Sequence, residues 1–185
     1  MSFGLEFTRR GKLSLTDGLN MTLFEICQWI QDTKFGTDLR ESQYMFPIVE
    51  SIHVLGLGAS VGLILWTDLR LVGAALRREP AIEVHEQMKP WMLTGFVVMM
   101  LSGALLFWSE AAKLYGSNTF RAKLIFLAIA GINALVFETR EARTGEVRRI
   151  ELGSLPLRAR LAGWVSLIAW TGVIVFGRWT AYGLK

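Results

Sequence analysis

The sequence predicts an all-α membrane protein: an antiparallel four-helix transmembrane bundle preceded by an amphipathic interfacial helix. Three stretches, 51–67, 90–109 and 161–177, contain no Lys, Arg, Asp or Glu, and a fourth at 124–137 is nearly as long. Crossing a hydrocarbon layer of about 30 Å takes about 20 apolar residues, and flanking residues that snorkel extend each stretch to that length. Hydrophobic residues make up 52% of the 185-residue chain, which is unusual for a soluble domain.

The four spans form a single domain. We expect them at about 46–71, 88–109, 120–139 and 161–182. The connections between them are too short for a separate soluble core, so the membrane domain extends over 45–185.

Ahead of this domain we expect an extended tail over 1–20 and an amphipathic interfacial segment over 21–44. Thr22 and Glu25 have the spacing of a capping box at the start of a helix. Leu23, Ile26 and Ile30 share one face of that helix. A helix this short lies on the membrane surface or against the bundle instead of crossing the bilayer.

Loop charge predicts the orientation of the bundle. The first and third loops hold ten basic residues, and the opposite face holds seven within reach of the span ends. By the positive-inside tendency, the first and third loops are cytoplasmic and the two termini are periplasmic. Because the basic residues lie at span ends, we expect the partners to be the lipid bilayer and other membrane-protein subunits, and not nucleic acid.

Small residues in the first two spans indicate close helix packing. Gly58 and Gly62 have small-xxx-small spacing, and we expect this pair to pack inside the bundle and not in a dimer. Gly95 and Gly103 offer a counterpart in the second span. Pro90 fits the first turn of that span, where a missing N–H is tolerated.

Ionisable groups within a span are costly, so Glu50 and His53 are the strongest chemical signal in the chain. Their spacing of three places both on one helix face near the outer boundary. Arg178 lies at a matching depth in the antiparallel fourth span, with Tyr182 nearby. These four residues define a candidate cofactor site.

The candidate site allows several chemistries. It can receive haem b, a quinone carbonyl or a metal ion, with His53 as the metal ligand and Met99 or Met100 as a second haem ligand. Alternatively, Glu50 and Arg178 form an interhelical ion pair that only fixes helix register. Methionines in apolar spans are also common packing residues.

A second polar group lies at the inner side, where we expect a collar formed by Asp68, Arg70, His85 and Asn133. Its expected role is to lock the topology through contacts between helices. His85 follows the inner end of the first span by a loop, so it is too far from His53 for both imidazoles to ligate one haem.

Four sequence patterns resemble a bacterial family of small four-helix integral membrane proteins to which no activity is assigned. They are Phe46-Pro47-x-x-Glu50-x-x-His53-x-x-Gly56, Asp68-Leu69-Arg70-Leu71-x-Gly73, Phe120-Arg121-x-Lys123 with Ala130-x-x-Asn133-Ala134, and Gly177-Arg178-Trp179-x-Ala181-Tyr182. More distantly, an early histidine in the first span and a lysine opening the third look like membrane protoporphyrinogen oxidases and copper-resistance-type membrane domains. In the oxidase pattern a further histidine is expected deep in the third span, where this chain has Asn133 or Glu138.

The sequence carries no nucleophile-base set, phosphate-binding loop, thiolate cluster or zinc spacing, which disfavours a hydrolase or a nucleotide enzyme. We therefore expect an integral subunit of a larger assembly in the bacterial cytoplasmic membrane, either non-catalytic or electron-carrying. A redox protein that binds haem b or quinone and a metal-ion carrier are the alternatives.

Overall fold

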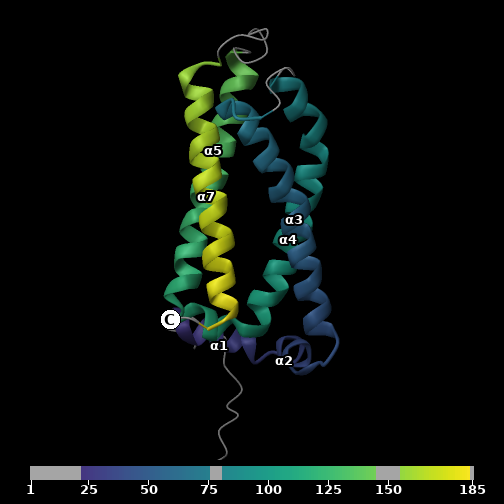
Figure 1. The fold of residues 1–185 in the computed structure, drawn as a ribbon. Helices are drawn as coiled ribbons and strands as arrows, with labels where there is room; N and C mark the ends of the chain where they lie inside the picture. Colours follow the sequence, from purple (N-terminus) through teal and green to yellow (C-terminus); the bar gives the residue numbers. More distant parts are fainter. Residues whose placement is uncertain (1–21, 76–80, 145–154, 184–185) are drawn as a thin grey trace, which may run out of the picture.

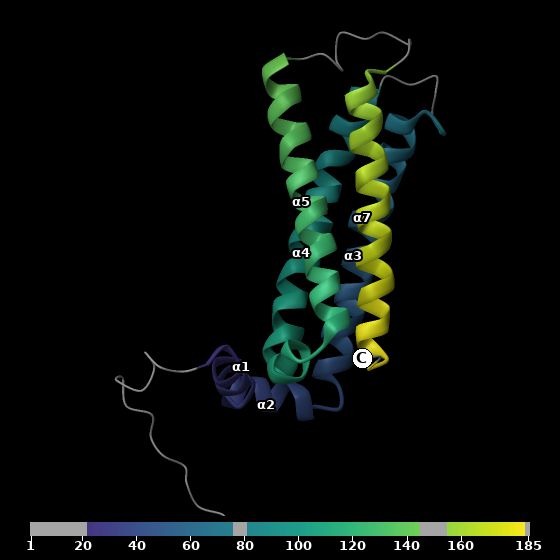
Figure 2. The same cartoon turned by 90° about the vertical axis from the view of Figure 1, so that its left-hand side faces the viewer.

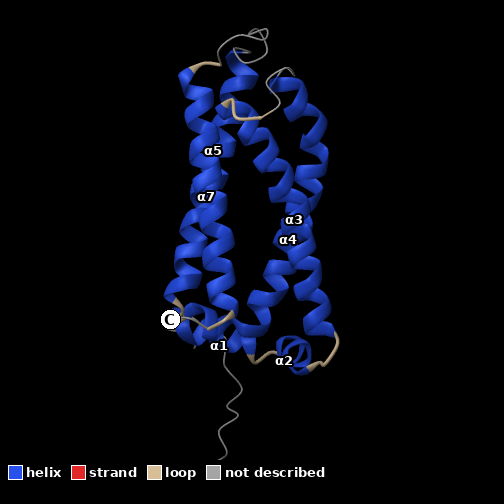
Figure 3. Ribbon diagram, in the orientation of Figure 1, coloured by secondary structure: helices blue, strands red, loops and turns tan. Residues whose placement is uncertain are grey.

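The computed structural model describes residues 22–75, 81–144 and 155–183. The helices are α1 (Leu23–Gln31), α2 (Lys34–Glu41), α3 (Met45–Val72), α4 (Ala81–Tyr115), α5 (Asn118–Thr144) and α7 (Leu157–Ala181) (Figure 1). Within these described ranges there is no strand (Figure 3). The predicted tail over 1–20 lies outside the described residues.

Four of these helices, α3, α4, α5 and α7, are long and apolar enough to cross a membrane. This confirms the prediction of an all-α chain with four spans, and the protein is a multi-pass membrane protein. Each observed helix contains most of the span predicted for it. α4 starts at Ala81, seven residues ahead of the predicted 88, and ends at Tyr115, six residues beyond the predicted 109, while α5 ends at Thr144, five residues beyond the predicted 139.

The placement of Pro90 in a first helical turn was wrong, because Pro90 lies inside α4. The turns before it are held by tertiary packing: Ala81 forms a buried cluster with Leu71 of α3 and Ala159 of α7. Proline removes one backbone donor from the helix. The carbonyl of Pro90 accepts a hydrogen bond from the Thr94 hydroxyl at 2.8 Å.

The bundle consists of two tightly packed antiparallel pairs. α3 packs most extensively on α4 and α5 on α7, while α3 also contacts α7, and α4 and α5 barely touch. Val61, Met99 and Trp170 are central members of the buried core that joins α3, α4 and α7, and Ala130 brings α5 to it.

Glycine lets α3 and α4 approach closely on only one side of α3. A Cβ on Gly95 would lie 2.9 Å from the Ser60 backbone nitrogen, and one on Gly56 would lie 3.1 Å from that of Met99. Nothing lies within 4 Å of a Cβ at Gly58 or Gly62. The expectation that Gly58 and Gly62 pack inside the bundle was therefore wrong. Two residues along a helix is a rotation of about 200°, so these glycines face outward while Gly56 and Ser60 face α4.

α1 and α2 lie across one end of the bundle (Figure 2), here called the α1–α2 end. The capping box predicted at Thr22 and Glu25 is present, and the Thr22 backbone N–H donates to the Glu25 carboxylate at 2.7 Å. The hydrogen bonds from Thr22 lower the pKa of Glu25. The Trp108 indole N–H donates to the Thr33 hydroxyl at 2.8 Å, which ties the α1–α2 junction to α4.

A local distortion of α4 allows a second hydrogen bond between α4 and the α1–α2 end. Glu110 has non-helical dihedral angles, φ −130° and ψ 28°, and the helix kinks there. Two residues later the Ala112 N–H donates to the Gln31 side-chain oxygen of α1 at 3.1 Å. The end of α1 thus supplies an acceptor for a backbone donor next to the kink.

Candidate functional site

The structure places the sequence-predicted residues in two separate groups at the two ends of the bundle. His53 contacts α4 near Ser102, whereas His85 lies 17 residues earlier on the same helix, about 25 Å away along its axis. The prediction that one haem cannot join the two imidazoles agrees with this spacing. The first group is at the α1–α2 end, and the second lies toward the opposite end.

His53 is fixed to α4 through one ring nitrogen. Its Nδ1 lies 2.9 Å from the Met99 carbonyl oxygen and 3.1 Å from the Ser102 hydroxyl oxygen. Because a carbonyl oxygen can only accept, we assign the hydrogen to Nδ1, and Nε2 of the neutral ring then carries the lone pair. Gly103 makes room for the ring, since a Cβ there would lie 3.0 Å from the imidazole Cε1.

Lys123 of α5 acts electrostatically on the His53 imidazole from another helix of the bundle. Its side chain passes over Gly177 of α7, where a Cβ would lie 3.8 Å from Nζ. All four spans therefore contribute to the surroundings of His53.

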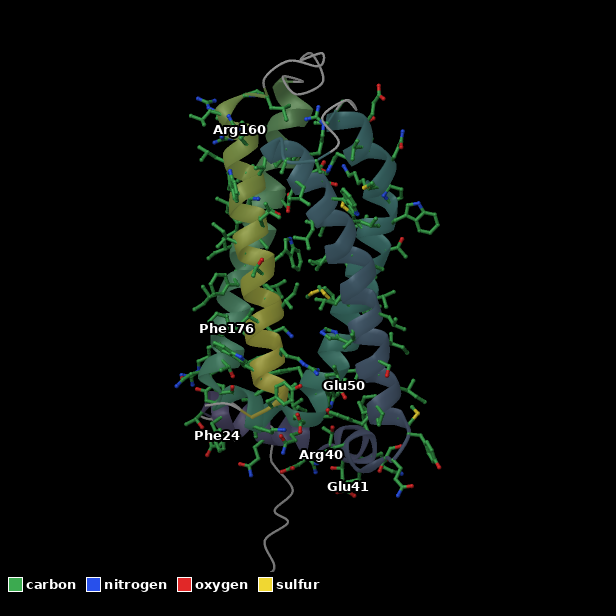
Figure 4. The ribbon with its side chains drawn as sticks, viewed as in Figure 1. Phe24, Arg40, Glu41, Glu50, Arg160 and Phe176 are labelled. Carbon is green, nitrogen blue, oxygen red and sulfur yellow. The ribbon has the colours of Figure 1, made fainter. Side chains whose placement is uncertain are left out.

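Met99 is the one member of the predicted outer site that bonds to His53, through its carbonyl; the described residues show no hydrogen bond or ion pair from His53 to Glu50, Met100, Arg178 or Tyr182. Glu50 is exposed, and Figure 4 shows it low on α3 toward the α1–α2 end. Arg178 donates to the Tyr182 hydroxyl at 2.8 Å, and its guanidinium lies 4.8 Å from that ring centre. Met100 is 44% exposed on the outside of α4, whereas the Met99 side chain belongs to the buried core. An ion pair between Glu50 and Arg178 is not among the contacts of the described residues.

Toward the opposite end, a carboxylate joins two basic side chains across α4 and α5. Glu138 accepts from Lys89 at 2.6 Å and from His85 Nε2 at 2.7 Å. The His85 ring also meets Phe137 edge-on, with the ring centres 5.7 Å apart. Because a carboxylate can only accept, the Nε2 atom of His85 carries a hydrogen.

The remaining polar groups at this end come from α3, α5 and α7. Asp68 is 5% exposed, and one of its oxygens is paired with the Ser166 hydroxyl. Asn133 donates from its side-chain amide to the Ala162 carbonyl at 3.0 Å. Arg70, the fourth member of the predicted collar, is buried in the last turns of α3 and does not line the cavity described next.

These polar groups close one end of a cavity of about 570 Å³ between the four spans. Its walls are mainly apolar and aromatic, with Met92, Phe96 and Trp170 reaching the middle of the bundle. Leu93 of α4 and Leu135 of α5 line it and are 59% and 64% exposed, so the cavity opens sideways between these two helices. We refer to the end formed by Asp68, His85, Lys89, Asn133, Glu138 and Ser166 as the polar end.

Two buried atoms at the polar end have no hydrogen-bond partner among the described residues: Asp68 Oδ2 and His85 Nδ1. Leaving a buried polar atom unsatisfied costs about 1–3 kcal/mol, so such atoms call for an explanation. The cavity, whose apolar walls meet a group of polar side chains at one end, is the stronger candidate site.

Residues 41–183 match DUF6644, a family of unknown function. The chain belongs to the DUF6644 family. The match covers all four spans. Comparison with curated proteins and with solved structures gave no match, so the distant resemblances stated above stay predictions.

Sequence reasoning on this DUF6644 chain found most of the polar end but not its role. It placed Asp68, His85 and Asn133 together on one side of the membrane. It missed Ser166, which looks like an ordinary small residue of an apolar span, and it did not predict that Lys89 pairs with Glu138. The signal for this pair was available: one acidic and one basic residue at the same depth in consecutive antiparallel spans.

Proposed function

We propose that the protein is an electron-carrying membrane protein that binds a quinone-class lipophile in the cavity. The cavity carries this proposal, since a volume of about 570 Å³ lies within the usual range for small-molecule sites. Its apolar walls suit a ring and the start of an isoprenoid tail, and the polar end offers hydrogen bonds to a head group. The opening between α4 and α5 faces the lipid, from which a lipophilic carrier would enter.

The test uses the full-length protein in lipid nanodiscs and a decyl-benzoquinone as the probe. Trp170 lines the cavity, so we expect saturable quenching of its fluorescence, and Trp170→Phe should remove that component. Ala134→Trp should block the cavity, because Ala134 lines it. Ala128→Trp is the matched control, since Ala128 is exposed on the same helix and does not line the cavity. Unchanged saturable quenching in Ala134→Trp would refute the proposal.

A quinone couple exchanges its electrons with another redox group, so we further propose that the chain is a subunit of a larger assembly. Support comes from a groove of about 680 Å³ on the outside of α3 and α4, lined by Gly58 and Gly62 and flanked by Trp66 and Trp91. Small residues allow the backbone of another transmembrane helix to approach closely. Gly62→Leu should release the chain from its assembly in mild detergent without changing benzoquinone binding. Unchanged co-migration would contradict this role for the groove.

His53 supports a second candidate, a haem b or metal-ion site at the α1–α2 end. A ligating histidine commonly donates its other ring N–H to a backbone carbonyl, as His53 Nδ1 does to Met99. In that candidate, Nε2 would be the ligand atom. A Soret band in the purified protein, sensitive to dithionite and lost in His53→Gln, would support haem. Metal uptake by cells that is unchanged by His53→Ala would eliminate the metal-ion carrier.

We propose the bacterial cytoplasmic membrane as the location, with the first and third loops cytoplasmic and both termini periplasmic. The ten basic residues of those loops, against seven on the other face, support this orientation. Glu41→Cys in a Cys27→Ser background places one thiol at an exposed position of α2. An impermeant maleimide that reaches the periplasm should label it in intact cells. Labelling only after lysis would reverse the orientation.

A further inference from the structure

We infer that the amide of Asn133 recognises the head group of the ligand in the cavity, and that it selects a flat, uncharged ring with an N–H donor on the atom next to a carbonyl. The inference rests on the proposed function, because it names which head groups the quinone-class site prefers. Among quinones, a ring with an amino substituent beside one carbonyl has this arrangement.

Asn133 faces the cavity from α5. Ala130, Ala134 and Phe137 line the cavity too, and they lie three residues before, one after and four after Asn133, on the same side of the helix. Ala162 of α7 also lines the cavity. The Asn133 side chain therefore lies in the cavity wall where α5 meets α7.

The contact with α7 fixes the orientation of the Asn133 amide. Its Nδ2 donates to the Ala162 carbonyl at 3.0 Å, and because a carbonyl can only accept, the amide nitrogen and oxygen cannot be exchanged. An asparagine amide has two N–H donors and one oxygen acceptor. The second N–H and Oδ1 make no further hydrogen bond to the described residues. Oδ1 is not among the buried atoms without a partner, so it is open to a bound molecule.

The two hydroxyl groups in the cavity wall are used within the protein. Thr67 gives its only hydroxyl hydrogen to the Leu63 carbonyl at 3.2 Å, and the Ser166 hydroxyl is paired with Asp68. Asn133 differs from both because it keeps a donor and an acceptor for a ligand. It also differs from the ionisable groups of the polar end, since an amide has the same donor and acceptor at any ordinary pH.

An amide that offers one N–H and one oxygen is complementary to a donor and an acceptor on neighbouring atoms. Asparagine pairs with the edge of an adenine base in this way, through two hydrogen bonds. A site of this kind discriminates against a ligand that lacks one of the two groups, because a polar atom of the protein is then left unpaired. A methyl-substituted quinone offers only the carbonyl, whereas an amino-substituted quinone offers both groups.

The experiment compares two ligands of nearly the same shape, an alkyl aminonaphthoquinone and the naphthoquinone in which a methyl group replaces the amino group. Binding to the full-length protein in nanodiscs is measured by calorimetry. We expect the aminoquinone to bind about fivefold more tightly, which is the effect of one additional hydrogen bond. Asn133→Leu should remove this preference, and a preference that survives in the variant would overturn the inference. Asn118→Leu is the matched control, because Asn118 is exposed on the same helix and does not line the cavity.

A second measurement separates Asn133 from the ionisable groups of the polar end, which are Asp68, His85, Lys89 and Glu138. Because the amide does not titrate, the preference for the aminoquinone should be the same at about pH 6 and about pH 8. A preference that is present at only one of these pH values would assign the selection to an ionisable group and overturn the inference.

Each remaining outcome decides a separate question. Equal affinity of the wild-type protein for the two quinones would overturn the inference and leave the proposed function standing, whether or not Asn133→Leu folds. If neither quinone binds, the proposed function fails, and an alkyl quinolone lactam, which has an N–H beside its carbonyl, tests the amide by itself. Saturable binding of the lactam that is lost in its N-methyl form would support the inference, and no binding would overturn it.

Discussion

The contact between α3 and α4 at Gly95 allows a sharp test of the fold. Gly95→Ala would place a Cβ 2.9 Å from the Ser60 backbone nitrogen and 3.1 Å from the Ser60 Cβ. Ordinary contacts begin near 3.4 Å, so the two helices must separate locally by about 0.5 Å. The contacting atoms are backbone and Cβ atoms, which cannot turn away. Separated surfaces lose about a quarter of their dispersion energy over such a gap.

Overpacking of this kind costs about 1–3 kcal/mol, and the rigid contact atoms place Gly95→Ala in the upper part of that range. Alanine regains up to about 1 kcal/mol of helix propensity over glycine. We therefore expect a net loss of about 1–2 kcal/mol in the free energy of unfolding. Gly58→Ala and Gly62→Ala are matched controls that meet nothing within 4 Å, so they should be neutral or slightly stabilising.

The assay is unfolding of the purified protein by SDS in mixed micelles, followed by far-ultraviolet circular dichroism. The result that would refute the reasoning is a Gly95→Ala protein as stable as Gly62→Ala. That outcome would mean that α3 and α4 do not approach at Gly95, and the outward position of Gly58 and Gly62 would also be in doubt.

Three further predictions concern the two ends of the bundle. Trp108→Phe removes the indole donor to the Thr33 hydroxyl, so it should lower the free energy of unfolding by about 0.5–1.5 kcal/mol and reduce the hydrogen-exchange protection of α1 and α2. Unchanged protection would mean that this hydrogen bond does not hold α1 and α2 on α4. The pKa of Glu25 is lowered by hydrogen bonds from Thr22, so the capping box stabilises α1 at neutral pH and weakens as the pH falls through that lowered pKa. Protection factors of α1 amides should show this acid loss in the wild type, and Glu25→Gln should abolish the pH dependence. Glu138→Gln should lower the free energy of unfolding in the SDS titration by about 1 kcal/mol, because the Glu138 side chain is 38% exposed and solvent screens its ion pairs. A loss above about 3 kcal/mol would contradict this and would mean that the ion pairs are buried away from solvent.

Much of the fold could be predicted because the constraints that fix it act along the chain. Uncharged stretches long enough to cross a bilayer marked the four spans, and spacing alone identified the capping box at Thr22 and Glu25. The start of α4 was less predictable. Ala81 and the turn after it are helical because they pack on Leu71 and Ala159, and distant residues of this kind are not visible in a local pattern.

The candidate site was likewise only partly predictable from the sequence. The cost of burying an ionisable group singled out Glu50 and His53 from the sequence. Asp68 and His85 were grouped because both lie at span ends on the same side of the bundle. The rotation of each helix about its axis could not be predicted, and it decided which of these groups meet. It left Glu50 exposed, while Arg178 bonds to Tyr182 at the end of its own helix.

The sequence by itself determined that this protein crosses a membrane with four helices, because transfer of apolar residues into lipid depends on composition and length. The tertiary structure alone decided that Gly95 and not Gly62 lies at the contact between α3 and α4, and that a cavity with one polar end lies between the spans. Lipid solvates any apolar helix face about equally well, so the choice of contacting faces depends on shape and hydrogen bonding between helices.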